Sequence, residues 1–237
     1  TETVVGGRVQ LFPSVEFKQG RSALPPQLKA ISSLYIPYAE FEWAGGDKNR
    51  ARVAGGAMGE VYAAERHGAE VAVKEIKEFV QLGCERHGNG SHESGADDEV
   101  LREFCKEVQL LESCRNQNIV LFIGYCFEQV GPADSSTYRL AVVTEYMARG
   151  SLWDNLHRRR VELRYSRRLR MLLDVVKGMQ YLRHMKIVHC DLKTPNLLVD
   201  RNFLIKVADF GLARLHKDSL VAQVSERERC EPPIRAW

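Results

Sequence analysis

Four polar side chains in the second half of the chain have the types and spacing to hold a phosphate and a metal ion. Asn196 and Asp209 flank two short apolar runs around an Asp-Arg-Asn turn, in the segment IVHCDLKTPNLLVDRNFLIKVADFG that starts at position 187. If both runs are strands of one hairpin, these two residues return to the same place. Their amide and carboxylate oxygens suit Mg²⁺, an ion that keeps its waters and binds substrate phosphates. Asp191 and Lys193 precede the hairpin, on the approach to that metal.

A buried charge is expected in the segment EVAVKEIK at residues 70–77. In a strand, Ala72, Lys74 and Ile76 share one face, and the opposite face is apolar as well. Burying the Lys74 ammonium without a partner would be costly or would remove its proton. Glu107 poses the matching problem in an otherwise apolar helical stripe, so we expect these two side chains to pair. Taken alone, a strand lysine is more often a surface residue whose stem lies along apolar neighbours.

A glycine-rich segment, VAGGAMGEV at residues 53–61, lies upstream of that strand. Gly55, Gly56 and Gly59 free the backbone to approach a ligand, and successive N–H groups there can face phosphate oxygens. A dinucleotide-binding turn of this kind needs a following helix, whereas residues 60–64 are typical of a strand. A simple turn without a ligand remains the alternative for this segment.

The elements that must position these groups are expected in a mixed order. Residues 46–82 alternate in polarity and are rich in Val and Ala, which predicts strands. Gly, Ser, His and acidic residues dominate 83–98, which predicts a mobile surface loop. Short strands are expected at 197–199 and 204–207, and another at 33–38 in a stretch without sustained periodicity.

Two helices are predicted from apolar periodicity. The first carries Val100, Phe104 and Leu111, with Glu107 on the same stripe. The second follows a run with seven arginines between Arg158 and Arg170. We interpret that run as a solvated face and loop, with a patch for phosphate or an acidic partner as the alternative. The buried face of the second helix is predicted to consist of Leu172, Val175, Val176, Met179 and Leu182.

Composition excludes several classes of protein. The 237 residues hold 34 Lys and Arg against 31 Asp and Glu, and the resulting charge of +3 is too small to indicate a nucleic-acid or membrane-surface protein. Neither a membrane helix nor a signal segment is recognisable. The six cysteines form no C-x-x-C pair, which favours a reducing compartment. Because the chain begins with Thr1, we expect it to be part of a longer or processed protein.

Taken in order, these motifs resemble those of the protein kinase family. The glycine-rich loop, the Val-Ala-Val-Lys strand, the helix glutamate, the Asp-Leu-Lys-Thr-Pro-Asn loop and Asp-Phe-Gly all occur between about Val53 and Gly211. The resemblance implies an α+β, bilobal fold. Its small lobe would be an antiparallel sheet with one helix, and its large lobe would be mainly helical and incomplete.

The resemblance also implies a role for each candidate residue. Lys74 would hold the α- and β-phosphates of ATP, with Glu107 fixing its position. Asp191 would accept the proton of the substrate hydroxyl, and Lys193 would steady the γ-phosphate. The other implied roles are Mg²⁺ ligation by Asn196 and Asp209, phosphate-loop contacts by Val53, Gly55, Gly56 and Gly59, adenine contacts by Val61, Ala72 and Leu198, and hinge contacts by Thr144 (as gatekeeper), Glu145 and Met147.

The implied reaction is transfer of the γ-phosphate of ATP to Ser or Thr hydroxyls of protein substrates. Thr194-Pro195 resembles the serine/threonine type, and the segment FIGY from Phe122 with the TEYM hinge resembles the tyrosine-kinase-like group. A cytoplasmic signalling enzyme that neither binds nucleic acid nor inserts into a membrane is expected. The implied domains are a flank at 1–45, a small lobe at 46–147 with an insertion at 83–98, and a partial large lobe at 148–237 that ends in the activation segment.

Several departures from the kinase pattern support an alternative. Ala54 stands where the first loop glycine is usual, and Cys190 replaces the arginine that usually precedes the catalytic aspartate. No Ala-Pro-Glu follows Gly211, and the helices that usually come next are not in the sequence. The alternative is therefore an inactive, truncated module that binds nucleotide or acts as a scaffold. Zinc binding by Cys84, His87 and His92 is a further, weaker possibility.

Overall fold

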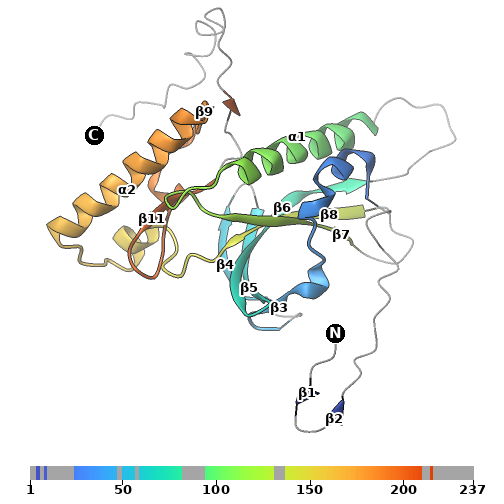
Figure 1. The fold of residues 1–237 in the computed structure, drawn as a ribbon, viewed down its shortest axis with the longest axis horizontal. Coiled ribbons are helices and arrows are strands. Elements are labelled where there is room, and N and C mark those ends of the chain that lie inside the picture. The colour runs from blue at the N-terminus through green and yellow to red at the C-terminus, as the bar shows by residue number, and fades with distance from the viewer. Residues whose placement is uncertain are drawn as a thin grey trace, which may run out of the picture.

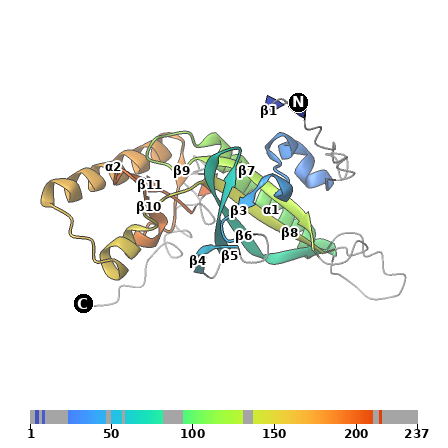
Figure 2. The same ribbon diagram turned by 90° about the horizontal axis from the view of Figure 1, so that it is seen from below.

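The computed structural model describes residues 4–5, 8–9, 24–46, 50–56, 59–81, 94–130, 137–209 and 214–215. Two parts lie side by side in it (Figure 1): a sheet crossed by helix α1 (Ser94–Ser113), and a smaller part that contains helix α2 (Tyr165–His184). The view in Figure 2 shows the same separation from below. This is the α+β, two-lobed arrangement that the sequence predicts. A separate small hairpin pairs β1 (Val4–Val5) with β2 (Arg8–Val9).

The small lobe is built on an antiparallel sheet with the strand order β3-β5-β6-β8-β7, and β4 pairs with β5. Val71 and Val73 are buried on one face, whereas Ala72 and Lys74 on the other face are half-buried, as the period of two predicts. The predicted strands between residues 46 and 82 are therefore confirmed. The strands are β3 (Glu42–Trp43), β4 (Arg52–Gly56), β5 (Gly59–Arg66), β6 (Ala69–Gln81), β7 (Phe122–Gln129) and β8 (Thr137–Glu145).

Helix α1 begins earlier than the sequence predicts. Residues 94–98 are helical, so the predicted loop over 83–98 is wrong for that part, and 83–93 lie outside the described residues. Near the start of the helix, Arg102 pairs with Asp98, which lies one turn before it. The predicted apolar stripe is confirmed: Leu101, Phe104, Val108 and Leu111 are buried, and Val100 and Glu107 are half-buried.

The segment before the sheet is packed rather than extended. The predicted strand over 33–38 is wrong, because residues 33–34 end the 3₁₀ helix η2 (Pro26–Leu34) and Tyr38 begins the 3₁₀ helix η3 (Tyr38–Glu40). Pairing with the sheet is limited to one bridge between Tyr35 and Tyr125. Proline supplies the physical reason, since Pro37 lacks an N–H group and would interrupt a ladder.

Helix α2 buries only part of the predicted stripe. Met171, Gly178 and Leu182 are buried, with Val175 and Met179 half-buried, but Leu172 and Val176 are 62% and 59% exposed. The prediction is thus wrong for Leu172 and Val176. Close packing at Gly178 sets the inner face, and positions one residue away point about 100° around the helix.

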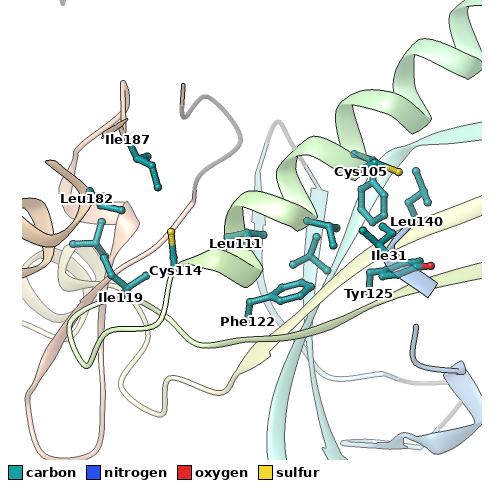
Figure 3. Packing of buried hydrophobic residues seen from close by; sticks show 14 of the residues in the cluster. Ile31, Cys105, Leu111, Cys114, Ile119, Phe122, Tyr125, Leu140, Leu182 and Ile187 are labelled. Atoms are coloured by element: carbon teal, nitrogen blue, oxygen red, sulfur yellow. The ribbon is translucent and has the colours of Figure 1, made fainter. Parts of the chain in front are cut away.

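One apolar cluster joins the two lobes. Figure 3 shows Ile31 and Tyr125 at one end of the cluster, Leu111 of α1 in the middle, and Leu182 and Ile187 at the other end. The chain between α1 and β7 runs through this cluster and so fixes both lobes to a shared core. A second cluster, around Trp43 and Val143, lies on the opposite face of the sheet.

Short elements complete the large lobe. In the part of the chain that the structure describes, neither long helix is apolar enough to cross a membrane. The strand predictions at 197–199 and 204–207 are confirmed to within one residue. The elements are a π-helical turn (Asp154–Arg158), β9 (Ile187–Val188), the 3₁₀ turn η5 (Thr194–Asn196), β10 (Leu197–Val199), β11 (Ile205–Val207) and β12 (Arg214–Leu215).

The contact at Gly178 leads to a stability prediction. A Cβ atom there would lie 2.8 Å from the Asn118 carbonyl oxygen and 2.9 Å from Val207 Cγ2. Gly178→Ala should therefore lower stability by about 1–3 kcal/mol through overpacking, although alanine normally favours a helix by about 0.5–1 kcal/mol. Thermal melts test this, with the exposed Val176→Ala as a control that should not lower the Tm. A higher Tm for Gly178→Ala would contradict the packing.

Candidate active site

One face of the sheet gathers several of the predicted ligand-binding residues. Val61 lies opposite Lys74 in the β5–β6 register, and Ala72 lies opposite Thr144 in the β6–β8 register. Directly paired residues of antiparallel strands share a face, and Ala72 and Lys74 are two apart on β6. Val61, Ala72, Lys74 and Thr144 therefore line the same side of the small lobe.

The β10–β11 hairpin brings the two predicted metal ligands together. Leu197 pairs with Val207, and the Ala208 N–H donates a 2.9 Å hydrogen bond to the Asn196 carbonyl oxygen. Asp209 is therefore the residue next to this contact, as the sequence predicts. Leu198, the predicted adenine contact, is half-buried on β10 and bridges to Ser151 after the hinge.

Lys74 makes its ion pair across the two lobes. Its Nζ lies 2.9 Å from Asp209 Oδ1, and the two side chains are 29% and 27% exposed. Pairing compensates for the cost of removing each charge from water. This contact brings the small-lobe sheet and the large-lobe hairpin to one point.

Asp191 is held as a carboxylate by two donors. Lys193 Nζ lies 2.6 Å from Asp191 Oδ2, and Asn196 Nδ2 donates to the same oxygen at 3.0 Å. The hydrogen bond from Lys193, more than that from Asn196, lowers the pKa of Asp191 below its ordinary value of 3.8. Asn196 Nδ2 also donates to the Asp191 carbonyl oxygen, so both of these bonds use the amide nitrogen and leave the amide oxygen for another ligand.

A buried histidine connects the loop of Asp191 to that of Asp209. His189 is 1% exposed; its Nδ1 accepts from the Asp191 N–H, and its Nε2 lies 2.9 Å from the Ala208 carbonyl oxygen. With Nδ1 as acceptor, Nε2 carries the proton and donates to Ala208. Cys190 and Asp209 both have positive φ, at 63° and 66°, a strained conformation that a surrounding hydrogen-bond network can maintain.

The glycine-rich segment forms a β hairpin rather than a turn into a helix. Gly55 pairs with Glu60, Gly56 pairs with Gly59, and a bulge precedes Ala54 at Val53. A Cβ atom on Gly59 would lie 2.1 Å from the Glu75 carbonyl oxygen, and its φ is +153°. Only glycine fits there, which lets the start of β5 approach the backbone of β6 closely.

The end of β8 and the segment after it are held by side-chain and backbone hydrogen bonds. Glu145 accepts hydrogen bonds at 2.7 Å from Lys206 Nζ and from the Leu121 N–H. Met147 is buried, and its carbonyl oxygen accepts a bond from the Gly150 N–H at 2.8 Å. The hinge backbone is therefore ordered next to the face that carries Lys74.

The family comparison agrees with this arrangement. A model described as protein tyrosine and serine/threonine kinase matches residues 48–236. The chain belongs to this kinase family. Similar proteins include the probable serine/threonine-protein kinase SIS8 of Arabidopsis thaliana, 40% identical over 73% of this chain and 15% of its own length. The serine/threonine-protein kinase CTR1 of the same plant is 40% identical over 74% of this chain and 19% of its own length. The probable serine/threonine-protein kinase drkA of Dictyostelium discoideum is 36% identical over 70% of this chain and 23% of its own length. The chain thus spans less than a third of the length of these relatives.

The predicted pairing of Lys74 with Glu107 is wrong for this kinase structure. No ion pair joins these side chains in the part of the chain that the structure describes, and Lys74 contacts Asp209 instead. Burial in the core beneath α1 raises the pKa of Glu107 above its ordinary value of 4.5, and the nearby Lys74 charge only partly offsets this. Two carboxylates thus compete for one ammonium, and Asp209 has the contact.

Sequence reasoning missed two residues next to the candidate site, His189 and Lys206. His189 stands two positions before Asp191, directly after β9, and its side chain is buried. Lys206 alternates with the buried Ile205 and Val207, so the period of two already places it on the outer side of β11, toward Glu145.

Other candidate sites can be compared with the structure only in part. The described residues contain no group of three or more His, Cys, Asp or Glu that could hold a metal, and Cys84, His87 and His92 lie outside them. A hollow of about 450 Å³ lies between the α1–β7 connection and α2, lined by polar residues such as Asn116, Lys177 and His184. The seven arginines between 158 and 170 are all exposed, as a solvated face would be.

The buried charge of Glu107 predicts a pH-dependent stability. Its folded-state pKa is raised, so ionisation lowers stability as the pH rises above about 4.5. Glu107→Gln should therefore raise the Tm at pH 7, by about 2–4 °C if the effect is about 1 kcal/mol, and the gain should disappear below pH 4.5. Melting curves across pH test this, with the exposed Glu103→Gln as control. A lower Tm at pH 7 would mean that attraction to Lys74 outweighs the cost of burial.

Proposed function

We propose that this chain transfers the γ-phosphate of ATP to Ser or Thr hydroxyls of protein substrates. The observation that carries the proposal is the meeting of Lys74, on the small lobe, with Asp209, beside the Asp191–Lys193–Asn196 cluster of the large lobe. A cation next to a carboxylate and an amide oxygen suits a metal-bound triphosphate. Thr194-Pro195 and the serine/threonine kinases among the similar proteins favour Ser and Thr over Tyr.

The oxygen atoms of Asp209 and Asn196 fit Mg²⁺ if phosphate oxygens complete its coordination shell. Asp209 offers a carboxylate and Asn196 an amide oxygen, and two protein oxygens leave most of an octahedral shell to water and phosphate. Mg²⁺ would supply neutralisation of the charge that develops on the phosphate oxygens. Lys74 would hold the α- and β-phosphates, and Lys193 the γ-phosphate.

The chain's own residues would position the nucleotide and handle one proton. Val61, Ala72 and Leu198 would contact adenine, and the backbone of Glu145 and Met147 would hydrogen-bond it, with Thr144 limiting the depth of the pocket. The loop residues Val53, Gly55, Gly56 and Gly59 would cover the phosphates. In the reaction, the substrate hydroxyl oxygen bonds to the γ-phosphorus, the bond from that phosphorus to the bridging oxygen of ADP breaks, and the hydroxyl proton passes to Asp191.

The remaining assignments follow from the same proposal. Residues 46–147 would form the small lobe and 148–237 part of the large lobe, ending in the activation segment. Protein substrates would be the partners, in the cytoplasm and in signalling. Residues 1–45 would be a flank by this division, yet apolar residues between 24 and 43 pack against the small lobe.

A second candidate is a nucleotide-binding or scaffolding module without transfer activity. Cys190 at the usual arginine position and the open Lys74–Glu107 pair favour it. Phosphorylation of a generic Ser/Thr substrate by the purified protein, lost in Lys74→Met, would refute this candidate. ATP binding without any such transfer would support it.

The role of Asp191 can be tested directly. Asp191→Asn keeps the shape of the side chain but removes the proton acceptor, so kcat should fall by about 10²–10⁴-fold. ATP affinity should change much less than kcat, because Asp191 is not among the residues proposed to hold the nucleotide and the amide of Asn can still accept the hydrogen bonds of Lys193 and Asn196. Steady-state phosphorylation assays and nucleotide titrations measure both quantities, with the exposed Glu162→Gln as control. Wild-type turnover in Asp191→Asn would contradict the assignment.

Lys193 should control the pH dependence of the reaction. Its hydrogen bond is the largest cause of the lowered pKa of Asp191, so Lys193→Ala should raise that pKa toward 3.8. Asp191 must be deprotonated to accept a proton, and the acidic limb of kcat/KM should therefore move to higher pH. The exposed Lys106→Ala should leave the profile unchanged. If the acidic limb of the kcat/KM profile lies at the same pH in Lys193→Ala as in the wild type, Lys193 does not control the ionisation of Asp191 and the prediction is contradicted.

A further inference from the structure

Residues 24–36, here named the N-terminal brace, fill the space between α1 and β7. Leu28 and Ile31 are 0% and 2% exposed and belong to the core cluster that contains Leu101 and Phe104 of α1. Figure 3 shows Ile31 among Cys105, Tyr125 and Leu140, that is, between the helix and the sheet. Burying these two apolar side chains stabilises the contact between the brace and α1.

Polar contacts tie the brace to both neighbours. On the helix side, Gln27 Nε2 donates to Asp98 Oδ1 at 2.8 Å, and Cys105 Sγ donates to the Gln27 carbonyl oxygen at 3.1 Å. On the sheet side, the Ile36 N–H donates to the Tyr125 carbonyl oxygen at 2.8 Å. The brace thus connects α1 to β7 and restricts movement of the helix relative to the sheet.

Strand β7 has a glycine where the brace docks. A Cβ atom on Gly124 would lie 2.5 Å from Ile36 Cδ1 and 2.5 Å from the Leu34 carbonyl oxygen. The β7–β8 register shifts between Phe122 and Gly124, next to the same place. The close approach of the brace to the sheet therefore depends on a residue without a side chain.

We infer that the brace positions α1, and through it Glu107, relative to Lys74. The match to the kinase family model starts at residue 48, so the brace lies outside the matched region and yet packs against the helix that carries Glu107. Leu28 and Ile31 are then positioning residues: they hold the helix, and the helix sets the field that the Glu107 carboxylate exerts at Lys74. This inference rests on the proposed function only in its consequence for ATP.

The test measures amide hydrogen exchange of α1 and of α2, together with the affinity for ATP in the presence of Mg²⁺. Ile31→Ala should accelerate exchange in α1 but not in α2, and should weaken ATP binding by about 3–10-fold, the size of coupling that residues outside a ligand site exert. Ile31→Val, which removes one methylene and keeps the fold, should change both in the same direction by less.

A matched control separates positioning from general stability. Val71→Ala truncates a buried side chain of the other core cluster, so it should lower the Tm while leaving α1 exchange and ATP affinity as in the wild type. The inference would be overturned if amide exchange in α1 stayed at the wild-type rate in both Ile31 variants. It would also be overturned if Val71→Ala changed α1 exchange and ATP affinity as much as Ile31→Ala does. A wild-type chain without ATP affinity would contradict the proposed function instead, and α1 exchange alone would then decide the role of the brace.

Discussion

The half-buried ammonium group of Lys74 constrains the arrangement of the side chains around it. The register of β5, β6 and β8 fixes where its side chain leaves the sheet, and the apolar neighbours on β6 prevent it from being fully hydrated. It therefore needs an anion nearby, and in this structure Asp209 supplies one at 2.9 Å. Asp209 can do so because the β10–β11 hairpin and a positive φ of 66° present it to the small lobe. The two lobes thus meet through a charge pair as well as through their shared apolar core.

The second carboxylate, Glu107, shows how the site is balanced. Its burial raises its pKa, so an ionised Glu107 costs stability unless α1 lets it approach Lys74. Triphosphate binding would engage Lys74 and alter this competition between carboxylates. Because the position of α1 also depends on the brace, packing at Leu28 and Ile31 and charge at Lys74 act on the same helix. An element outside the matched family region would thereby influence the nucleotide site.

The motifs predicted the local structure around Asp209 and Lys74 well, for physical reasons. Two short strands joined by the Asp-Arg-Asn turn pair with each other, which places Asp209 next to Asn196. The period of two on β6 likewise placed Lys74 on the face it occupies.

In contrast, no sequence pattern shows whether Asp209 or Glu107 is the partner of Lys74, because the choice depends on distances between elements. The brace was missed since 3₁₀ turns rich in proline have no sustained period. Leu172 and Val176 were placed on the buried face because both inner and outer faces of α2 are apolar, and only the contact at Gly178 distinguishes them.

The most direct test is a double-mutant cycle on nucleotide binding. ATP affinity would be measured by calorimetry, with and without Mg²⁺, in the wild type, Lys74→Met, Asp209→Asn and the double variant. We expect Mg²⁺ to strengthen ATP binding in the wild type and to have no such effect in Asp209→Asn. The effects of the two substitutions on ATP affinity should be non-additive, because the two residues are in contact. Equal affinities in all four proteins, with or without Mg²⁺, would contradict a nucleotide site built on Lys74 and Asp209.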